Sequence, residues 1–182
     1  MSEPATPPTA DTPGFDAASQ KRLFDAFAAL GIAPEVVEHE AAFTVSDSRE
    51  LRGALPGVHT KNLFLKDKKG RLFLVTAPED AAIDLKAIHT AIGARGRVSF
   101  GSADRMLEHL AIVPGSVTPL ALINDTAGAV TFVLHPAVAE AAIVNVHPLR
   151  NTATVALTGA QFAAFLTHID HEPLVVALPE PA

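Results

Sequence analysis

The sequence predicts an α/β fold, α+β in character, in which helices flank a mixed, mostly antiparallel sheet or a partly closed barrel. Segments of helical and of strand periodicity alternate irregularly, a pattern that excludes a purely doubly wound sheet. Two turn-rich segments, at 67–70 and 124–128, each separate two apolar runs and predict hairpins. With 182 residues and 48% hydrophobic content, the chain can bury the core of one domain.

The chain divides into a tail and one domain. Residues 1–15 are rich in Pro, Thr and Ala, which predicts a disordered tail, and no linker composition interrupts 16–182. The domain begins with a helix over 17–30, because Asp16 can cap its N-terminus and Gly31 can end it.

The remaining elements follow from periodicity and from the turn residues that bound them. Helices are predicted where apolar residues recur at helical spacing, over 46–55, 84–92, 102–110, 136–142 and 159–169. Ser46 can cap the first of these, and Pro136 suits the first turn of the fourth. Strands are predicted for short apolar runs between turn signals, over 35–39, 61–66, 71–77, 118–123, 129–134, 143–146, 152–157 and 174–178.

The absence of cysteine, tryptophan and tyrosine limits the catalytic and metal-binding chemistry that the chain can use. Cysteine is absent, which excludes disulfides, thiolate nucleophiles and cysteine metal ligands. Tryptophan and tyrosine are absent too, so ten phenylalanines carry all aromatic packing. No apolar run approaches the ~20 residues that span a bilayer, and the first residues lack the pattern of a signal peptide. A cytoplasmic location without membrane contact is therefore expected.

The charge is acidic overall and basic locally. A net charge of -6 argues against a general nucleic-acid binder. Basic residues nevertheless cluster at 66–71 and at 95–97, and Lys66, Arg95 and Arg97 are predicted to contact RNA. The alternative is that the first cluster is simply the solvated tip of a hairpin.

Common catalytic motifs are not found. The chain lacks G-x-S-x-G, H-E-x-x-H, a Walker loop and a Rossmann fingerprint. The eight histidines show no tight metal spacing, and His168 with His171 suits the end of a helix better than a metal site. No metal and no organic cofactor is expected.

Lys61 and Asn62 stand at the start of an otherwise apolar strand. A lysine there can extend its ammonium into water. It can also lie at the mouth of a pocket and bind a phosphate or the carbonyl oxygen of an ester. Because side chains alternate along a strand, Lys61 and Asn62 face one ligand only if the strand begins with a bulge or a turn.

Two later segments could complete a site. Gly115 to Pro119 is either an ordinary loop or a backbone cradle, since glycine permits close approach to a ligand and proline fixes the turn. Ser116 within it has no recognisable His-Asp partners and is a poor nucleophile. His147 lies at a strand end on the same face as Asn145, where a histidine can be an ordinary core residue or part of a site.

These segments together resemble the YbaK/ProX family of aminoacyl-tRNA editing enzymes. The resemblance rests on His59 to Asp67, Gly115 to Pro119 and Asn145 to Asn151, in that order, and covers roughly residues 17 to 178. It is greatest to the free-standing branch that removes alanine from proline tRNA (ProXp-ala, or PrdX). It implies a single editing domain with a mixed, antiparallel-rich barrel.

The resemblance also implies an activity and a site. The activity is hydrolysis of alanyl-tRNA(Pro), with the acceptor end of the tRNA as substrate and prolyl-tRNA synthetase as a further partner. The residues implied to act in catalysis are Lys61, Asn62, Gly115 and His147. The residues implied to bind substrate are Thr44, Ser116, Pro119 and Asn145.

Two other functions remain open from the sequence. One is a binding module that keeps the fold without hydrolysis and holds tRNA or the synthetase. The other is a deacylase for cysteine or serine tRNA, because the size of the pocket depends on side chains far apart in the chain.

Overall fold

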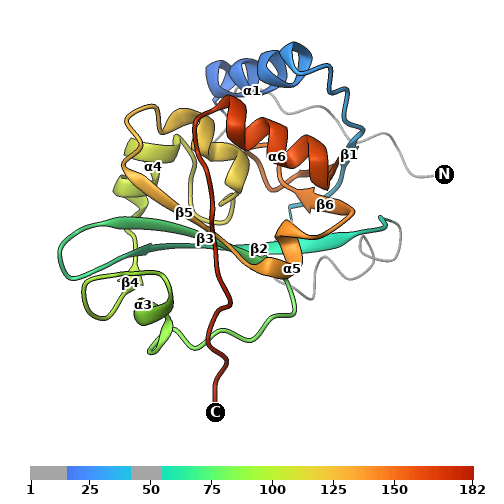
Figure 1. Cartoon of the computed structure of the whole chain (residues 1–182). Coiled ribbons are helices and arrows are strands. Elements are labelled where there is room, and N and C mark those ends of the chain that lie inside the picture. Colours follow the sequence, from blue (N-terminus) through green and yellow to red (C-terminus); the bar gives the residue numbers. More distant parts are fainter. Residues whose placement is uncertain (1–15, 42–54) are drawn as a thin grey trace.

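An eight-stranded mixed sheet organises the computed structural model, which describes residues 16–41 and 55–182 (Figure 1). Its strands are β1 (Val36–Glu38), β2 (Val58–Lys66), β3 (Leu72–Pro78), β4 (Ser99–Phe100), β5 (Val130–Leu134), β6 (Ile143–Val146), β7 (Ala153–Thr158) and β8 (Leu174–Val175). The order is β1-β7-β6-β2-β3-β5-β8, with β4 beside β2. Four of the seven pairings are antiparallel, which confirms the predicted fold class.

Helices cover both faces of the sheet. They are α1 (Ala17–Ala29), α3 (Ile88–Ala91), α4 (Ala103–Leu110), the 3-10 helix η1 (Pro119–Asn124), α5 (Pro136–Ala139) and α6 (Gly159–His168). Asp16 caps α1 as expected, accepting from the amide of Ala18 at 3.1 Å. Thr158 and Gln161 form a reciprocal capping box at the start of α6.

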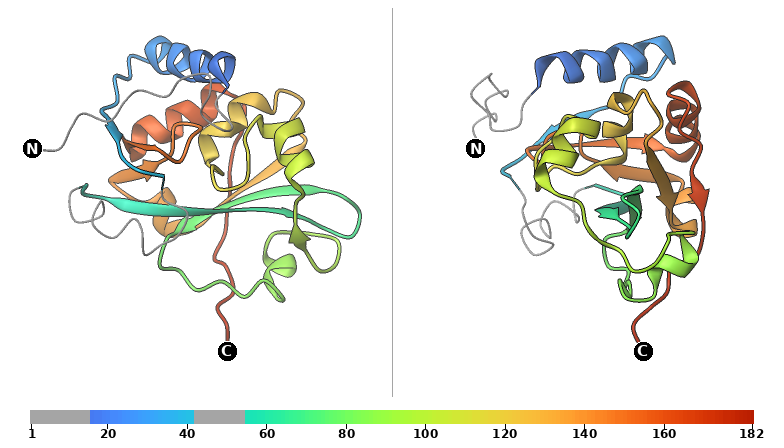
Figure 2. Two further views of the ribbon diagram at one scale, coloured as in Figure 1. Left: turned by 180° about the vertical axis from the view of Figure 1, so that it is seen from behind. Right: turned by 90° about the vertical axis from the view of Figure 1, so that its left-hand side faces the viewer.

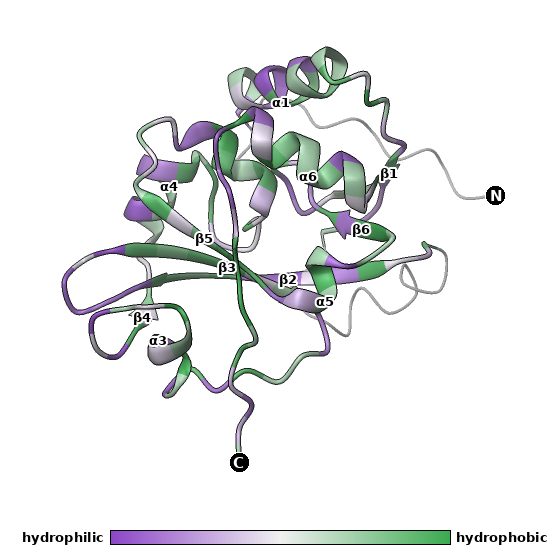
Figure 3. Ribbon diagram, in the orientation of Figure 1, coloured by the Kyte–Doolittle hydropathy of each residue, from purple (hydrophilic) through white to green (hydrophobic). Residues whose placement is uncertain are grey.

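Two apolar cores lie on the two sides of the β2–β3 ribbon. Figure 2 shows α1 and α6 on one side and α3 on the other. Phe27 and Phe165 pack in the first core with ring centroids 5.5 Å apart. Ile88 and Ile92 of α3 pack in the second core. Six consecutive residues of β3 are buried because both faces of this strand are covered. The turn between β2 and β3 is exposed instead, and Figure 3 shows its hydrophilic colouring.

The predicted strand 118–123 is wrong, because residues 119–124 form the 3-10 helix η1. Thr118 caps this helix through its hydroxyl, and Pro119, which has no amide hydrogen to donate to a ladder, occupies its first turn. A fully buried apolar run has the same composition in a strand and in a buried helix. The hairpin predicted around 124–128 is therefore wrong too, and β5 instead pairs in parallel with β3 and β8.

Smaller differences concern element bounds. The helix predicted at 84–92 is reduced to α3, and the two-residue strand β4 lies in the segment expected to connect two helices. The predicted tail 1–15, residues 46–54 of the predicted second helix and Thr44 lie outside the described residues. Among the residues that the structure describes, no helix is long and apolar enough to cross a membrane.

Candidate functional site

An interrupted edge of β2 marks the candidate site. On the edge opposite β3, β6 pairs with Val58 and His59, and β4 pairs with Leu65 and Lys66. Within the described residues, no ladder pairing is formed on this edge over 60–64. Polar side chains from β2, from the 115–119 loop and from the end of β6 converge beside this gap.

Asn62 links β2 to the glycine loop. Its Nδ2 donates to the backbone oxygen of Val117 at 3.0 Å, and its Oδ1 accepts from the hydroxyl of Thr76 at 2.6 Å. Thr76 is fully buried and lies opposite Asn62 on β3. Because both ends of the amide are engaged, Asn62 holds the loop at a fixed distance from the sheet.

The loop itself is tied to β6. The hydroxyl of Thr118 donates to the backbone oxygen of His147 at 2.7 Å. Gly115 adopts a φ of 92°, a conformation that residues with a Cβ rarely adopt, and it is exposed. Ser116 and Pro119 are buried beneath it. The structure thus ties the 115–119 loop to Asn62 through Val117 and to His147 through Thr118, and the role of Gly115 in a cradle stays a prediction.

His147 is a half-buried histidine held in one tautomer. Its Nδ1 lies 2.8 Å from the backbone oxygen of Ala153, and because a carbonyl only accepts, Nδ1 carries the hydrogen. Burial lowers the pKa of His147 below its ordinary value of 6.5, and the charge of His39 adds to this effect. The bond to Ala153 and the charge of Glu79 oppose the shift without cancelling it. His147 is therefore neutral near pH 7, with the lone pair on Nε2.

His39 lies beside His147 although no sequence signal connects them. Their ring centroids are 6.1 Å apart, and His39 Nε2 lies 2.9 Å from the hydroxyl of Thr154. The pairing of β1 with β7 brings His39 here, and Arg150 clamps the preceding Glu38 through two bonds of 2.5 and 2.6 Å. Only the tertiary pairing of these strands could have identified His39 as a neighbour of the site.

Asn145 supplies a buried acceptor. Its Nδ2 donates to the backbone oxygen of Pro56 at 3.0 Å, and the hydroxyl of Thr60 donates to its backbone oxygen at 3.0 Å. Its Oδ1 is buried and has no hydrogen-bond partner among the described residues. An unpaired buried acceptor is destabilising unless a ligand or water supplies a donor.

Lys61 does not lie with Asn62. The register of β2 against β3 runs without a bulge through this point, so the two side chains leave the strand on opposite faces. The Lys61 ammonium donates to the backbone oxygen of Ala81, which packs against the second core. Both residues could face one ligand directly only if β2 began with a bulge or a turn, and it does not.

The two basic segments of the sequence meet at the far end of the β2–β3 ribbon. The buried carboxylate of Asp67 accepts backbone N–H groups from Lys69 at 2.8 Å, Arg71 at 3.0 Å and Arg95 at 2.9 Å. Burial raises the pKa of Asp67, but these three bonds outweigh it and leave the pKa lowered. The carboxylate thereby joins the hairpin turn to the 95–97 segment, and Arg97 and Lys66 are exposed nearby.

Comparison with known proteins decides the family. A model of the aminoacyl-tRNA editing domain matches residues 39–165, well over half of the chain. The chain belongs to the aminoacyl-tRNA editing domain family. This confirms the resemblance that the sequence motifs indicate.

Relatives of this editing domain are named for prolyl-tRNA synthetase. Prolyl-tRNA synthetase associated domain-containing protein 1 of Bos taurus is 40% identical over 164 residues, which cover 88% of this chain and 93% of that protein. Prolyl-tRNA editing protein ProX of Acetoanaerobium sticklandii is 36% identical over 124 residues, 68% of this chain and 75% of that protein. A solved structure named as a candidate trans-editing enzyme for prolyl tRNA synthetase shares the fold, with a TM-score of 0.65 at 17% identity over 91% of this chain and 100% of that chain.

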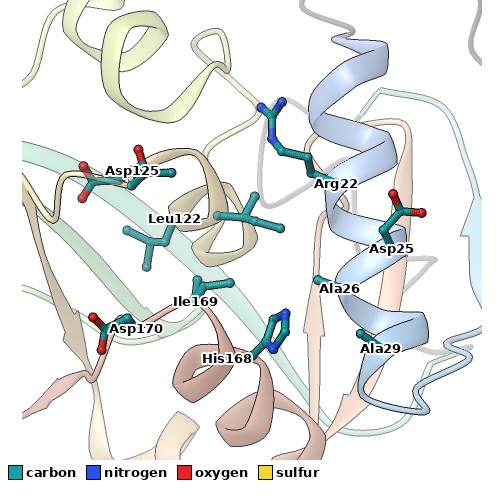
Figure 4. A pocket seen from close by; sticks show the side chains of 11 residues that line it. Arg22, Asp25, Ala26, Ala29, Leu122, Asp125, His168, Ile169 and Asp170 are labelled. Atoms are coloured by element: carbon teal, nitrogen blue, oxygen red, sulfur yellow. The ribbon is translucent and has the colours of Figure 1, made fainter.

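The editing domain also contains a cavity away from the β2 edge. It has a volume of about 530 Å³ and lies between α1, η1 and α6 (Figure 4). Arg22, Asp25 and His168 line it with mixed charge, and none of its lining residues is a predicted site residue. In the described part of the domain, no group of three or more His, Asp or Glu side chains could hold a metal ion.

Proposed function

We propose that this protein is a trans-acting aminoacyl-tRNA deacylase that hydrolyses alanine wrongly attached to proline tRNA. The observation that carries the proposal is the imidazole of His147, oriented by Ala153 beside the 115–119 loop that Asn62 holds. Family membership and the names of the relatives support the substrate class. Charged tRNA is made and used in the cytoplasm, so the proposal carries a cytoplasmic location with it.

The proposed reaction needs one water molecule and no cofactor. Nε2 of His147 accepts a proton as the water oxygen bonds to the carbonyl carbon of the ester. The resulting intermediate breaks the bond between that carbon and the ribose oxygen. His147 returns the proton to the ribose oxygen, and the products are free amino acid and a tRNA with its hydroxyl restored. A second ribose hydroxyl can assist by polarising the water.

The developing negative charge on the carbonyl oxygen requires a donor. We assign this role to Lys61, whose ammonium uses one of its three N–H groups on Ala81. Because Lys61 faces the other side of β2 from Asn62, this role requires its side chain to leave Ala81 and turn around the unpaired edge of the strand. The buried Oδ1 of Asn145 is suited to accept from the amino group of the substrate.

Amino-acid selection would rest on size. A cavity that accommodates the methyl group of alanine excludes the ring of proline. Serine is nearly the same size as alanine, so such a cavity excludes it only weakly. Deacylation of cysteinyl- or seryl-tRNA is the second candidate activity. A non-catalytic module that binds tRNA or the synthetase is the third, and the retained Lys61, Asn62 and Gly115 argue against it.

Deacylation of a panel of charged tRNAs by the purified protein tests the proposal. We expect alanyl-tRNA(Pro) to be hydrolysed, seryl-tRNA more slowly and prolyl-tRNA not at all. A hydrophobic pocket separates near-isosteres by only ~10–200-fold, so some serine release is consistent with it. Preferred hydrolysis of cysteinyl- or prolyl-tRNA would replace the alanine assignment, and hydrolysis of none would favour the binding module.

A further inference from the structure

Phe100 is the one exposed phenylalanine among the residues that the structure describes, with 61% of its surface accessible. Single exposed apolar residues are common on protein surfaces and carry no meaning alone. Phe100 differs because its backbone is paired with β2 and because basic residues surround it.

The backbone around Phe100 is fixed against β2. Phe100 pairs with Leu65, and the amide of the next residue, Gly101, donates to the backbone oxygen of Phe64 at 2.8 Å. A Cβ on Gly101 would lie 2.4 Å from the ring of Phe64, so glycine is needed for this close approach. The aromatic ring of Phe100 thus stands on a strand edge that is paired with β2, and not on an unpaired loop.

The charge around this edge is positive on a protein whose net charge is -6. Six of the fourteen Lys and Arg residues of the chain lie in the two joined basic segments, and all six are exposed: Lys66, Lys68, Lys69, Arg71, Arg95 and Arg97. The acidic Asp67 among them is buried and occupied by backbone amides. On α4, Arg105 lies 3.5 Å from Glu108, and Asp104 is also exposed. An exposed ring beside clustered cations is the pattern of single-stranded nucleic-acid binding.

We propose that Phe100 stacks on a base in the unpaired 3′ end of the tRNA, while Lys66 and Arg97 contact its phosphates. The inference rests on the proposed function for the identity of the RNA. Phe100 lies opposite Leu65, on the face of β2 that carries Lys61 rather than Asn62, and four residues along the strand from Lys61, which is about 13 Å. A stacked strand advances about 3.4 Å per nucleotide, so the ring lies within reach of the nucleotides that precede the one at the site. An aromatic ring stacks on the flat face that every base has, so this contact depends little on the sequence of the RNA.

Binding of uncharged RNA tests this without any hydrolysis. The probe is an acceptor-stem hairpin with its unpaired 3′ nucleotides, compared with the same hairpin made blunt. We expect Phe100→Leu to raise Kd for the overhang probe by about 5- to 150-fold, whereas Phe100→Tyr keeps the affinity. Leu174→Ala, at an exposed apolar residue on β8, is the matched control and leaves Kd unchanged. The blunt hairpin is insensitive to all three substitutions.

The salt dependence separates stacking from charge. Phe100→Leu leaves the slope of log K against log salt unchanged, whereas Arg97→Ala reduces it by roughly 0.7. Phe100→Trp introduces the sole tryptophan of the chain, and its fluorescence should be quenched by the overhang probe and not by the blunt one.

The outcomes separate this inference from the proposed function. An unchanged Kd for Phe100→Leu, or an equal loss on the blunt hairpin, overturns the stacking role even if mischarged tRNA is hydrolysed. Failure of the wild-type protein to bind either hairpin overturns it as well. Phe100-dependent binding without hydrolysis of any charged tRNA leaves the inference standing and removes the proposed function.

Discussion

The side chains of Lys61 and Asn62, adjacent in the chain, leave β2 on opposite faces of the sheet. Lys61 reaches the backbone oxygen of Ala81 beside the second core, and Asn62 reaches that of Val117 in the glycine loop. The two residues therefore cannot be treated as one catalytic unit. Each has a separate structural partner, and each can be tested separately.

Lys61→Ala should lower kcat for alanyl-tRNA(Pro) by about 100- to 1000-fold, the usual effect of removing one oxyanion donor, or ~2.7–4 kcal/mol. Its Tm should change little if the ammonium acts mainly on the substrate. Lys61→Arg is the matched control, because it keeps the charge. A marked drop in Tm with near-wild-type turnover would instead assign Lys61 to the structural bond with Ala81.

Asn62→Ala should destabilise the protein and impair turnover together. It removes the donor to Val117 and leaves the buried hydroxyl of Thr76 without its acceptor, and an unsatisfied buried polar group costs about 1–3 kcal/mol. Thr76→Val removes only the second bond. Denaturation of the two single variants and the double variant measures the coupling between these residues, and strict additivity would contradict the network.

The acid limb of the pH–rate profile should report His147. Its neutral form is required to accept a proton, and its lowered pKa places the loss of kcat/KM below pH 6.5. His39→Gln removes a charge that lowers this pKa, so the midpoint should move upward. His147→Gln should lose most activity together with this limb. A midpoint at or above 6.5 in the wild type would exclude His147 as the base.

The same shift makes stability depend on pH. Between the lowered folded pKa of His147 and 6.5, the unfolded chain binds a proton that the folded chain does not. The contribution of His147 to the free energy of unfolding therefore falls as pH decreases through this window. Equilibrium denaturation should show a weaker fall for His147→Gln than for the wild type, and equal slopes would contradict the shift.

Reversal of charge at Lys66 together with Arg97, each to Glu, should weaken tRNA binding and flatten its salt dependence, because both residues lie in the joined basic segments. Asp67→Asn should also weaken binding, although it makes the region less negative, since it disrupts the carboxylate that joins the two segments. Exposed Glu172→Gln is the control of equal charge change. Tighter binding by Asp67→Asn would show that the net charge of this region governs the affinity for tRNA, and not the way in which Asp67 joins the two basic segments.

The local pattern of the chain was enough to predict the fold class, α1 and the β2–β3 hairpin. Asp16 and Gly31 bound a helical repeat, and the turn at 67–70 joins two apolar runs that can pair in only one compact way. In these features neighbouring residues carry the information. The grouping of Asn62, the 115–119 loop and His147, which lie far apart in the chain, was indicated only by the family resemblance.

Long-range packing decided the rest. The apolar run 118–123 has the composition of a buried strand, but its packing in the first core accommodates the 3-10 helix η1, which Thr118 caps and Pro119 begins. An uninterrupted register separated Lys61 from Asn62, and the pairing of β1 with β7 placed His39 beside His147. Such relationships arise between segments far apart in the chain, where the free energy of burial and hydrogen bonding selects one arrangement that no short window of sequence records.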